Sequence, residues 1–208
     1  MEIIPNFIVF EGGDGSGTTT QVSLLGERLK TTSKIDFFST FEPTDGQIGR
    51  IIRSALKKEA CFKPETLAFL FAADRNEHLY GKDGILEHTN KGGLAVCDRY
   101  LMSSLVYQGI ECGFELPNSL NGRFPAPELT IFLDIDPETA LERVKTRHSY
   151  EIYEYLDFQV KVRESYKSVA ALYSKAGARV ETLDASKPAQ EIASEVWSIV
   201  CQMPIFKA

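Results

Sequence analysis

The stretch FIVFEGGDGSGTTT, from Phe7 to Thr20, decides how the rest of this chain is interpreted. A short apolar run rich in β-formers ends at four closely spaced glycines, and a helix-compatible segment from Gln21 to Leu29 follows at once. Glycine allows positive φ angles, and a loop before a helix presents N–H groups together with the positive end of the helix dipole. Such a loop can hold a phosphate group. The stretch therefore predicts a strand, a phosphate-binding loop and a helix.

The spacing from Gly12 to Gly17 matches the phosphate-binding pattern GxxxxGK[ST], except that Thr18 stands where the pattern has lysine. Thr19 occupies the [ST] position, so its hydroxyl is predicted to ligate Mg²⁺. A glycine-rich turn that binds no phosphate is the alternative, and the flanking strand and helix argue against it. Thr18 can donate a hydrogen bond but brings no positive charge. Because one preorganised donor is worth about a hundredfold to a thousandfold in rate in other enzymes, we expect catalysis to suffer more than binding.

The length and charge of the chain exclude several classes of protein. Its 208 residues suffice for one well-cored α/β domain, and we expect a single domain over residues 1–208. The 23 basic and 29 acidic residues give a formal charge of −6, which argues against a nonspecific nucleic-acid surface. No apolar run is long enough to span a bilayer and no N-terminal signal pattern is present, so a soluble cytoplasmic protein without a membrane partner is expected. The four scattered cysteines are interpreted as reduced thiols.

Apolar runs and helical periodicity alternate along the rest of the chain. After the strand that ends at Phe10, strands are predicted at 35–40, 94–97, 129–134 and 179–183. Helices are predicted at 21–29, 47–56, 64–80, from about 85 to 91, at 101–109, from 137, at 156–175 and at 188–200. This alternation predicts an α/β fold with a parallel five-stranded sheet and helices on both faces. A short aromatic segment at about 148–155 is predicted to be a lid.

Polar side chains follow several of these strands, at the sheet edge where α/β folds place their ligands. Asp98 closes the strand at 94–97 and suits a Mg²⁺-bound water, and Arg99 beside it suits a phosphate. A plain surface ion pair is the alternative. Arg53 lies on the helix that follows the turn signal Glu42-Pro43-Thr44-Asp45-Gly46, so it is a second candidate at this edge.

Two pairs of side chains lie four residues apart on predicted helices, so each pair projects from one helix face. Phe71 and Arg75 could be a core phenylalanine and a surface arginine, or an aromatic plate and a guanidinium for a flat base that carries a carbonyl. Arg143 and Arg147 could be a surface pair near a helix C-terminus, where cations are favoured, or a pair that meets an anionic ligand.

Several segments, in this order and spacing, resemble those of one enzyme family. The chain is similar over nearly its whole length to the thymidylate kinases, of the P-loop nucleoside monophosphate kinase family. The segments that carry the resemblance are Phe10-Glu11-Gly12-Gly13-Asp14-Gly15-Ser16-Gly17, Glu42-Pro43-Thr44-Asp45-Gly46, Leu70-Phe71-Ala72-Ala73-Asp74-Arg75, Asp98-Arg99-Tyr100 with Ser103-Ser104 and Tyr107-Gln108, and Leu133-Asp134-Ile135-Asp136-Pro137. The resemblance implies a P-loop NTPase type of fold and the reaction ATP + dTMP giving ADP + dTDP, with Mg²⁺.

The resemblance also implies a role for each matching residue at the acceptor. Phe71 would stack on thymine, Arg75 would bond a ring carbonyl, and Ser104 with Gln108 would help to read the base edge. Tyr107 would crowd the 2′ position of the sugar and so favour a deoxynucleotide. Arg53 and Arg99 would hold the monophosphate. The implied substrate-binding residues are Glu42, Pro43, Arg53, Phe71, Arg75, Arg99, Ser104, Tyr107 and Gln108.

On the donor side, the resemblance implies that Asp14 lies near the reacting phosphates and Mg²⁺, and that Arg143 and Arg147 meet the donor nucleotide and the transferred group. The implied catalytic residues are Asp14, Arg99 and Arg147, and the implied metal ligands are Thr19 and Asp98. The residues implied to bind the donor are Gly12, Gly15, Ser16, Gly17, Thr18, Thr19, Thr20 and Arg143. In-line transfer would then rest on positioning and charge neutralisation.

The chain departs from the family pattern mainly by missing cations. Thr18 replaces the loop lysine, Phe41 stands where many members have arginine, and residues 149–154 contain no Lys or Arg. Two hypotheses therefore stay open: an active dTMP kinase that uses Thr18 in place of lysine, or a nucleotide-binding pseudoenzyme that has lost phosphoryl transfer. Analogy with a family of homodimers implies a homodimer.

Overall fold

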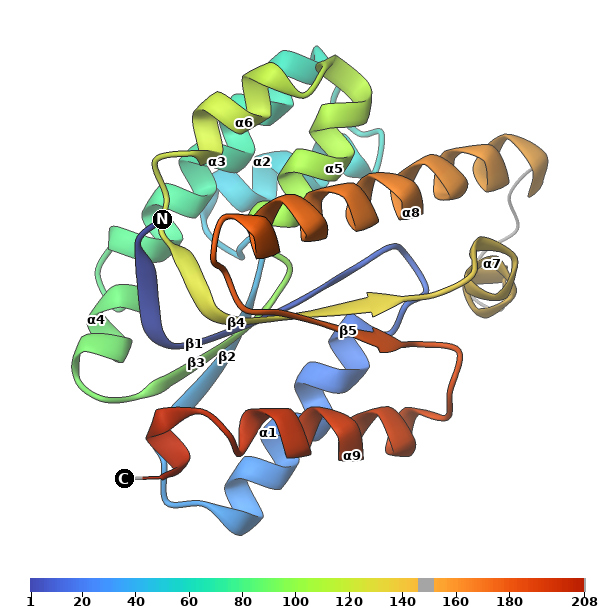
Figure 1. Cartoon of the computed structure of the whole chain (residues 1–208). Helices are drawn as coiled ribbons and strands as arrows, with labels where there is room; N and C mark the ends of the chain where they lie inside the picture. The colour runs from blue at the N-terminus through green and yellow to red at the C-terminus, as the bar shows by residue number, and fades with distance from the viewer. Residues whose placement is uncertain (146–151, 208) are drawn as a thin grey trace.

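A five-stranded parallel sheet forms the centre of the computed structural model, which describes residues 1–145 and 152–207 (Figure 1). Its strands lie in the order β2-β3-β1-β4-β5, and all four pairings are parallel. The strands are β1 (Ile3–Gly12), β2 (Phe37–Phe41), β3 (Leu94–Asp98), β4 (Ala126–Asp134) and β5 (Val180–Asp184). The predicted fold class is confirmed. With β1 in the middle, its carboxyl end lies between those of β3 and β4, where sheets of this kind bind ligands.

Helices cover both faces of the sheet. In Figure 1, α1 and α9 lie against one face, and α3, α5, α6 and α8 lie on the other side. The helices are α1 (Thr18–Thr32), α2 (Gln47–Leu56), α3 (Pro64–Tyr80), α4 (Ile85–Asn90), α5 (Leu101–Cys112), α6 (Glu115–Asn121), α7 (Pro137–Lys145), α8 (Ile152–Lys175) and α9 (Ala189–Val200), with a 3₁₀ turn at Pro204–Phe206. The predicted bounds of α2 and α3 agree with the structure.

Alternate residues of β1 enter two separate cores. Phe7 and Val9 pack among residues of α4, α5 and α8, whereas Ile8 and Phe10 pack among residues of α1 and α9. All four side chains are at most 1% exposed. A strand buried on both faces reads as a continuous apolar run, which is why FIVF carried a strand signal without alternation. The two cores together hold the end of β1, and the loop that follows it, in place.

The largest differences from the sequence-based expectation lie in three parts of the fold. β1 begins at Ile3 rather than Phe7, because the chain pairs with β4 on both sides of an irregularity between Ile4 and Ile8, where Asn6 has φ 56°. The seven-residue helix α6 was not predicted, since it is short and carries Pro117 in its first turn. Helix α8 begins at Ile152 rather than 156. Part of the predicted lid at 148–155 therefore lies outside the described residues, and its last four residues belong to α8.

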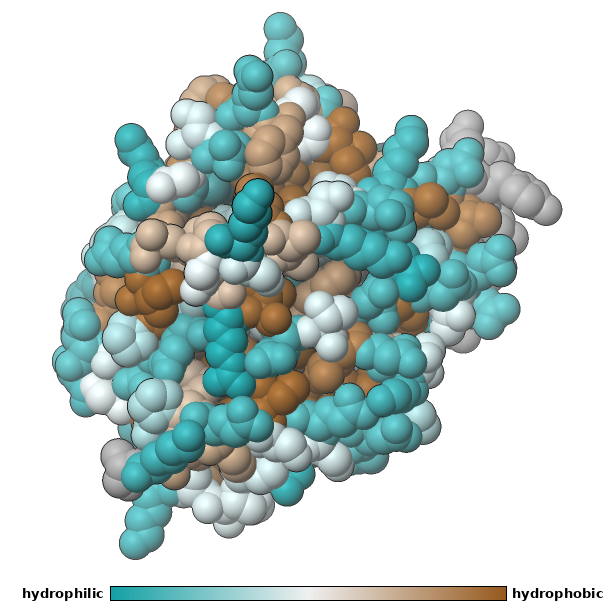
Figure 2. Space-filling view, in the orientation of Figure 1, coloured by the Kyte–Doolittle hydropathy of each residue, from teal (hydrophilic) through white to brown (hydrophobic). Residues whose placement is uncertain are grey.

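Hydrophilic side chains cover most of the face drawn in Figure 2, and apolar side chains appear among them in small groups. In the described ranges, 1–145 and 152–207, no helix combines the length and apolar character needed to cross a membrane.

Candidate active site

The loop between β1 and α1 passes too close to its neighbours for larger residues. A Cβ on Gly15, which has φ 83°, would lie 2.5 Å from the carbonyl oxygen of Ala140 in α7. A Cβ on Gly12 would lie 2.9 Å from the carbonyl oxygen of Leu133 in β4. The loop and the first turn of α1 line a cleft of about 1130 Å³, which we call the loop cleft. All the predicted loop residues except Gly12 line it: Gly15, Ser16, Gly17, Thr18, Thr19 and Thr20.

Positive charge reaches the loop cleft from outside the loop. Thr18 is buried, at 5% exposure, and Arg99, Arg143 and Lys187 are the cations among the described lining residues. The Arg143 guanidinium donates from Nη1 to the carbonyl oxygen of Ala185 at 2.9 Å. The Lys187 ammonium lies 2.6 Å from Glu195. Arg143 therefore joins α7 to the segment before α9.

Two oxygen ligands suited to Mg²⁺ meet at the start of α1. The Thr19 hydroxyl donates to Oδ2 of Asp98 at 2.5 Å, and Asp98 ends the neighbouring strand β3. The other carboxylate oxygen, Oδ1, is buried and accepts no hydrogen bond within the described part of the chain. Hydroxyl and carboxylate oxygens are hard ligands, and Mg²⁺ is commonly held by one or two carboxylates together with substrate phosphates. The donor set fits this ion.

Asp14 and Arg99 meet where the loop cleft joins a second cavity. Nη2 of Arg99 donates to Oδ1 of Asp14 at 2.7 Å, and the Tyr107 hydroxyl approaches the same oxygen at 3.3 Å. The guanidinium of Arg99 also lies over the Tyr107 ring, 5.3 Å from its centre. Burial raises the pKa of Tyr107 to about 12, despite the opposing charge of Arg99, so its hydroxyl stays protonated at neutral pH.

The second cavity, about 400 Å³ in volume, lies between α3 and α5, and we call it the α3–α5 cavity. It is mixed in character, with aromatic rings and aliphatic side chains beside amide, hydroxyl and charged groups. Of the residues predicted to bind the acceptor, it is lined by Glu42, Pro43, Phe71, Arg75, Arg99, Ser104, Tyr107 and Gln108. Gln108 is only 5% exposed, and its Oε1 accepts no hydrogen bond from the described residues. A carboxamide with a spare acceptor suits a ligand that carries an N–H group.

Asp14 and Arg99 line both cavities, so two ligands could meet at this pair. The model of the thymidylate kinase family matches residues 10–196. The chain belongs to the thymidylate kinase family. It is 39% identical over 202 residues to a protein described as a probable thymidylate kinase of Pyrobaculum aerophilum, covering 97% of this chain and 99% of that one. A protein of Methanococcus maripaludis with the same description is 45% identical, over 77% of this chain and 75% of that one. Another, of Methanocaldococcus jannaschii, is 42% identical, over 81% of this chain and 83% of that one.

The surroundings of Arg75 decide whether it is a surface arginine or, as the resemblance to the thymidylate kinase family implies, part of the acceptor site. The Arg75 side chain is 1% exposed, and its Nη2 donates to Glu42 at 2.5 Å and to the carbonyl oxygen of Tyr100 at 2.9 Å. Nη2 also lies 3.2 Å from the Ser104 hydroxyl, and Nη1 bonds the side-chain oxygen of Asn121. The surface-arginine alternative is therefore wrong. Arg75 is held at the wall of the α3–α5 cavity by the loop that carries Glu42, by the start of α5 and by α6.

Of the arginines predicted to bind the acceptor, Arg53 does not line the α3–α5 cavity. Arg53 donates to the carbonyl oxygen of Pro43 at 2.7 Å and to Asp45 at 2.5 Å. It thus holds the turn that carries Pro43, while its contact with a phosphate stays a prediction. Arg147 lies outside the described residues.

Glu11 has a structural task that its position in the sequence did not reveal. Its carboxylate is buried and turned toward the start of α5. It accepts the backbone N–H groups of Tyr100, Met102 and Ser103 at 2.9 to 3.2 Å, and the Ser103 hydroxyl at 2.6 Å. Burial raises the pKa of Glu11, and the hydrogen bonds and Arg99 oppose that rise. Glu11 therefore joins the phosphate-binding loop to the helix that carries Ser104, Tyr107 and Gln108.

Proposed function

We propose that this protein transfers the terminal phosphoryl group of ATP to dTMP, giving ADP and dTDP. The observation that carries the proposal is the meeting of the loop cleft and the α3–α5 cavity at Asp14 and Arg99. An oxygen of the dTMP phosphate would attack the γ-phosphorus, and the bond between that phosphorus and the β–γ bridging oxygen would break. No covalent enzyme intermediate is needed, because catalysis in this class rests on positioning and electrostatic stabilisation.

In the proposed complex, dTMP occupies the α3–α5 cavity. Phe71 stacks on the base, while Arg75, Ser104 and Gln108 face its polar edge, as their shared lining of one cavity supports. Tyr107 packs against the sugar and disfavours a 2′-hydroxyl. Arg99 neutralises the monophosphate, with Arg53 as a further cation beside the Pro43 turn.

ATP occupies the loop cleft in this proposal, with its phosphates on the N–H groups of the loop and of the first turn of α1. Thr19 and Asp98 hold Mg²⁺, which supplies charge neutralisation at the phosphate oxygens when bound. Arg143 of α7 lines this cleft and meets the donor, and the same role is proposed for Arg147, which lies outside the described residues. Arg99 is the described arginine that reaches both ligands, so we assign it the largest share of charge stabilisation.

We further propose that the protein is a cytoplasmic homodimer. Large apolar side chains are exposed on α2, on α3 and between them: Ile51, Leu56, Phe62, Phe69 and Tyr80. Exposed apolar side chains of this size support burial against a second copy. Sedimentation at micromolar concentration tests the dimer, and a monomeric mass would exclude it.

A coupled assay of ADP release with ATP, Mg²⁺ and dTMP, run beside a control without dTMP, tests the proposed reaction. Release that depends on dTMP supports the kinase. Thr18 favours one competing function, a nucleotide-binding pseudoenzyme. That function predicts dTMP binding in a calorimeter with no ADP formed under any divalent metal, and one dTMP-dependent turnover would exclude it.

Thr18→Lys is expected to leave the affinity for dTMP unchanged and to raise turnover modestly. Lysine would restore a cation beside the transferred phosphoryl group, whereas the α3–α5 cavity does not include position 18. Steady-state kinetics with varied dTMP, and calorimetry of dTMP binding, measure the two quantities. A large fall in turnover would mean that the loop is specialised around threonine.

A further inference from the structure

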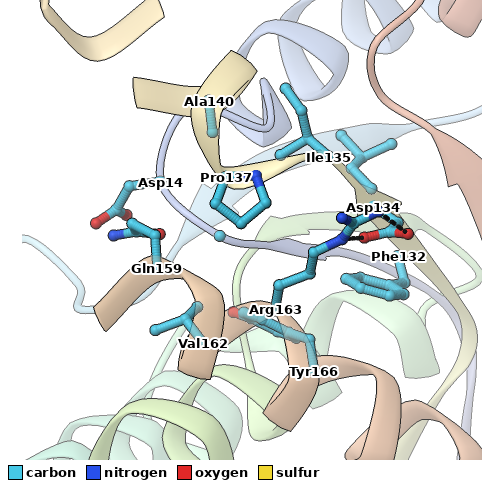
Figure 3. Close-up of a pocket in the computed structure, with 12 residues that line it drawn as sticks. Asp14, Phe132, Asp134, Ile135, Pro137, Ala140, Gln159, Val162, Arg163 and Tyr166 are labelled. Carbon is cyan, nitrogen blue, oxygen red and sulfur yellow. Dashed lines mark hydrogen bonds and ion pairs between the residues drawn. The ribbon is translucent and has the colours of Figure 1, made fainter. Parts of the chain in front are cut away.

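A small pocket lies behind the phosphate-binding loop, between the loop, β4 and α8 (Figure 3). Gly13 and Asp14 line both this pocket and the loop cleft, so this part of the loop separates the two. On the far side, Arg163 of α8 clamps Asp134 of β4 through two hydrogen bonds of 2.6 and 3.0 Å. The pocket therefore has one firmly held wall and one wall made of a glycine-containing loop.

Gln159 of α8 faces the loop across this pocket. The residue is 3% exposed, and its Oε1 lies 3.4 Å from the position that a Cβ on Gly13 would occupy. Figure 3 shows its carboxamide beside Asp14. The Nε2 donor is buried and makes no hydrogen bond with any residue that the structure describes. Because buried donors almost always find an acceptor, this unpaired N–H group calls for an explanation.

In the part of the loop nearest to Gln159, one backbone N–H group is hydrogen-bonded within the loop and does not face the cleft. The backbone N–H of Ser16 donates to the carbonyl oxygen of Gly13 at 3.1 Å. An N–H bonded inside the loop is not available to a phosphate. Glycine at position 13 lets the following peptide turn at low cost, since no Cβ restricts it. If that carbonyl turned toward α8, it would meet the Gln159 carboxamide, whose terminal torsion is soft enough to present Nε2.

We propose that Gln159 is a positioning residue for the donor phosphates. When a nucleoside triphosphate binds, the Gly13 carbonyl turns to accept from Nε2 of Gln159, and the Ser16 N–H is released to the phosphate chain. The inference rests on the proposed function, because it takes the loop cleft as the donor site. The proposed role of Gln159 matters more because Thr18 replaces the loop lysine. Without that lysine, each N–H group directed at phosphate carries a larger share of the binding.

The variant Gln159→Met tests this role, because methionine keeps the length and flexibility of glutamine but cannot donate. The control is Gln202→Met, an exposed glutamine close to the C-terminus. We expect Gln159→Met to weaken ATP binding, measured by calorimetry without dTMP, by about threefold to tenfold, the range of one ordinary hydrogen bond. The affinity for dTMP should not change. Without nucleotide, the variant should unfold at the wild-type temperature or above, since it removes an unpaired buried donor, while ATP should raise that temperature less.

Several outcomes would overturn the inference. ATP binding equal to wild type in the folded variant would remove the role, and equal losses for ATP and dTMP with a lower unfolding temperature would indicate structural support alone. A crystal structure of the wild-type protein with a non-hydrolysable ATP analogue tests the same step without a variant: a Ser16 N–H still bonded to Gly13 would contradict it. Wild-type protein that binds no ATP would overturn the proposed donor site and this inference together, whereas ATP-dependent turnover with an unaffected variant would overturn the inference alone.

Discussion

Arg99→Met is expected to lower the turnover of dTMP by about a hundredfold to a thousandfold, the cost of removing one preorganised charge-stabilising donor. Arg99 lines both the loop cleft and the α3–α5 cavity, and its Nη2 lies 2.7 Å from Asp14 where they join. Methionine keeps an apolar stem of similar length but carries no charge. The loss should therefore fall mainly on the chemical step, where negative charge is transferred between the two phosphates.

The measurement is the coupled assay of ADP release with both nucleotides saturating. The matched control is Arg179→Met, which removes an arginine paired with Glu181 on the surface, away from both cavities. Arg99→Lys should fall between wild type and Arg99→Met, because lysine keeps the charge but not the two-pronged geometry. If Arg99→Met kept turnover close to that of the wild type, the charge at this position would have no role in transfer.

Most of the fold could be predicted from local signals, because most of its elements carry a start signal, a stop signal or a periodic pattern within a short stretch. Helix α3 shows why: Pro64 at its first position and Gly81 just after its last residue fix both ends, and its bounds agree with the prediction. The first part of β1 could not be predicted in this way, since its pairing with β4 passes through an irregularity at Asn6. Distant pairing, rather than local pattern, places those residues in a strand.

The loop residues and the lining of the α3–α5 cavity were predicted from motifs, whereas the groups that hold them were not. Glu11 stands beside the loop glycines, yet its partners are backbone N–H groups about ninety positions later in the chain. Asn121 and Gln159 lie in segments with no motif. Asn121 bonds the side chain of Arg75, and Gln159 lies close to Gly13 of the loop. Such contacts depend on how α6 and α8 pack, and no local spacing encodes that.

The buried pair of Arg75 and Glu42 is expected to dominate the stability of the α3–α5 cavity. Arg75→Met should lower the free energy of unfolding by about 3–5 kcal/mol, because it leaves a buried carboxylate without its main partner. Both side chains are at most 3% exposed, and Nε and Nη2 of Arg75 lie 2.9 and 2.5 Å from the same oxygen of Glu42. Burial acts to lower the pKa of Arg75, but the adjacent carboxylate outweighs it and the pKa lies above its usual value. Arg75 therefore stays charged.

Urea unfolding of Arg75→Met, Glu42→Gln and the double variant measures the pair as a thermodynamic cycle. Each single change strands one buried charge, whereas the double change leaves neither, so the double variant should lose clearly less than the sum of the two. His78 is the remaining partner of Glu42, at 3.0 Å, and it bonds the Thr40 hydroxyl at 2.7 Å, so it can keep its place in the double variant. Arg179→Met should cost less than about 1 kcal/mol, as exposed pairs do. Losses that simply add would contradict the coupling, and Arg75 would then act on the cavity through its contacts with Asn121 and Tyr100 instead.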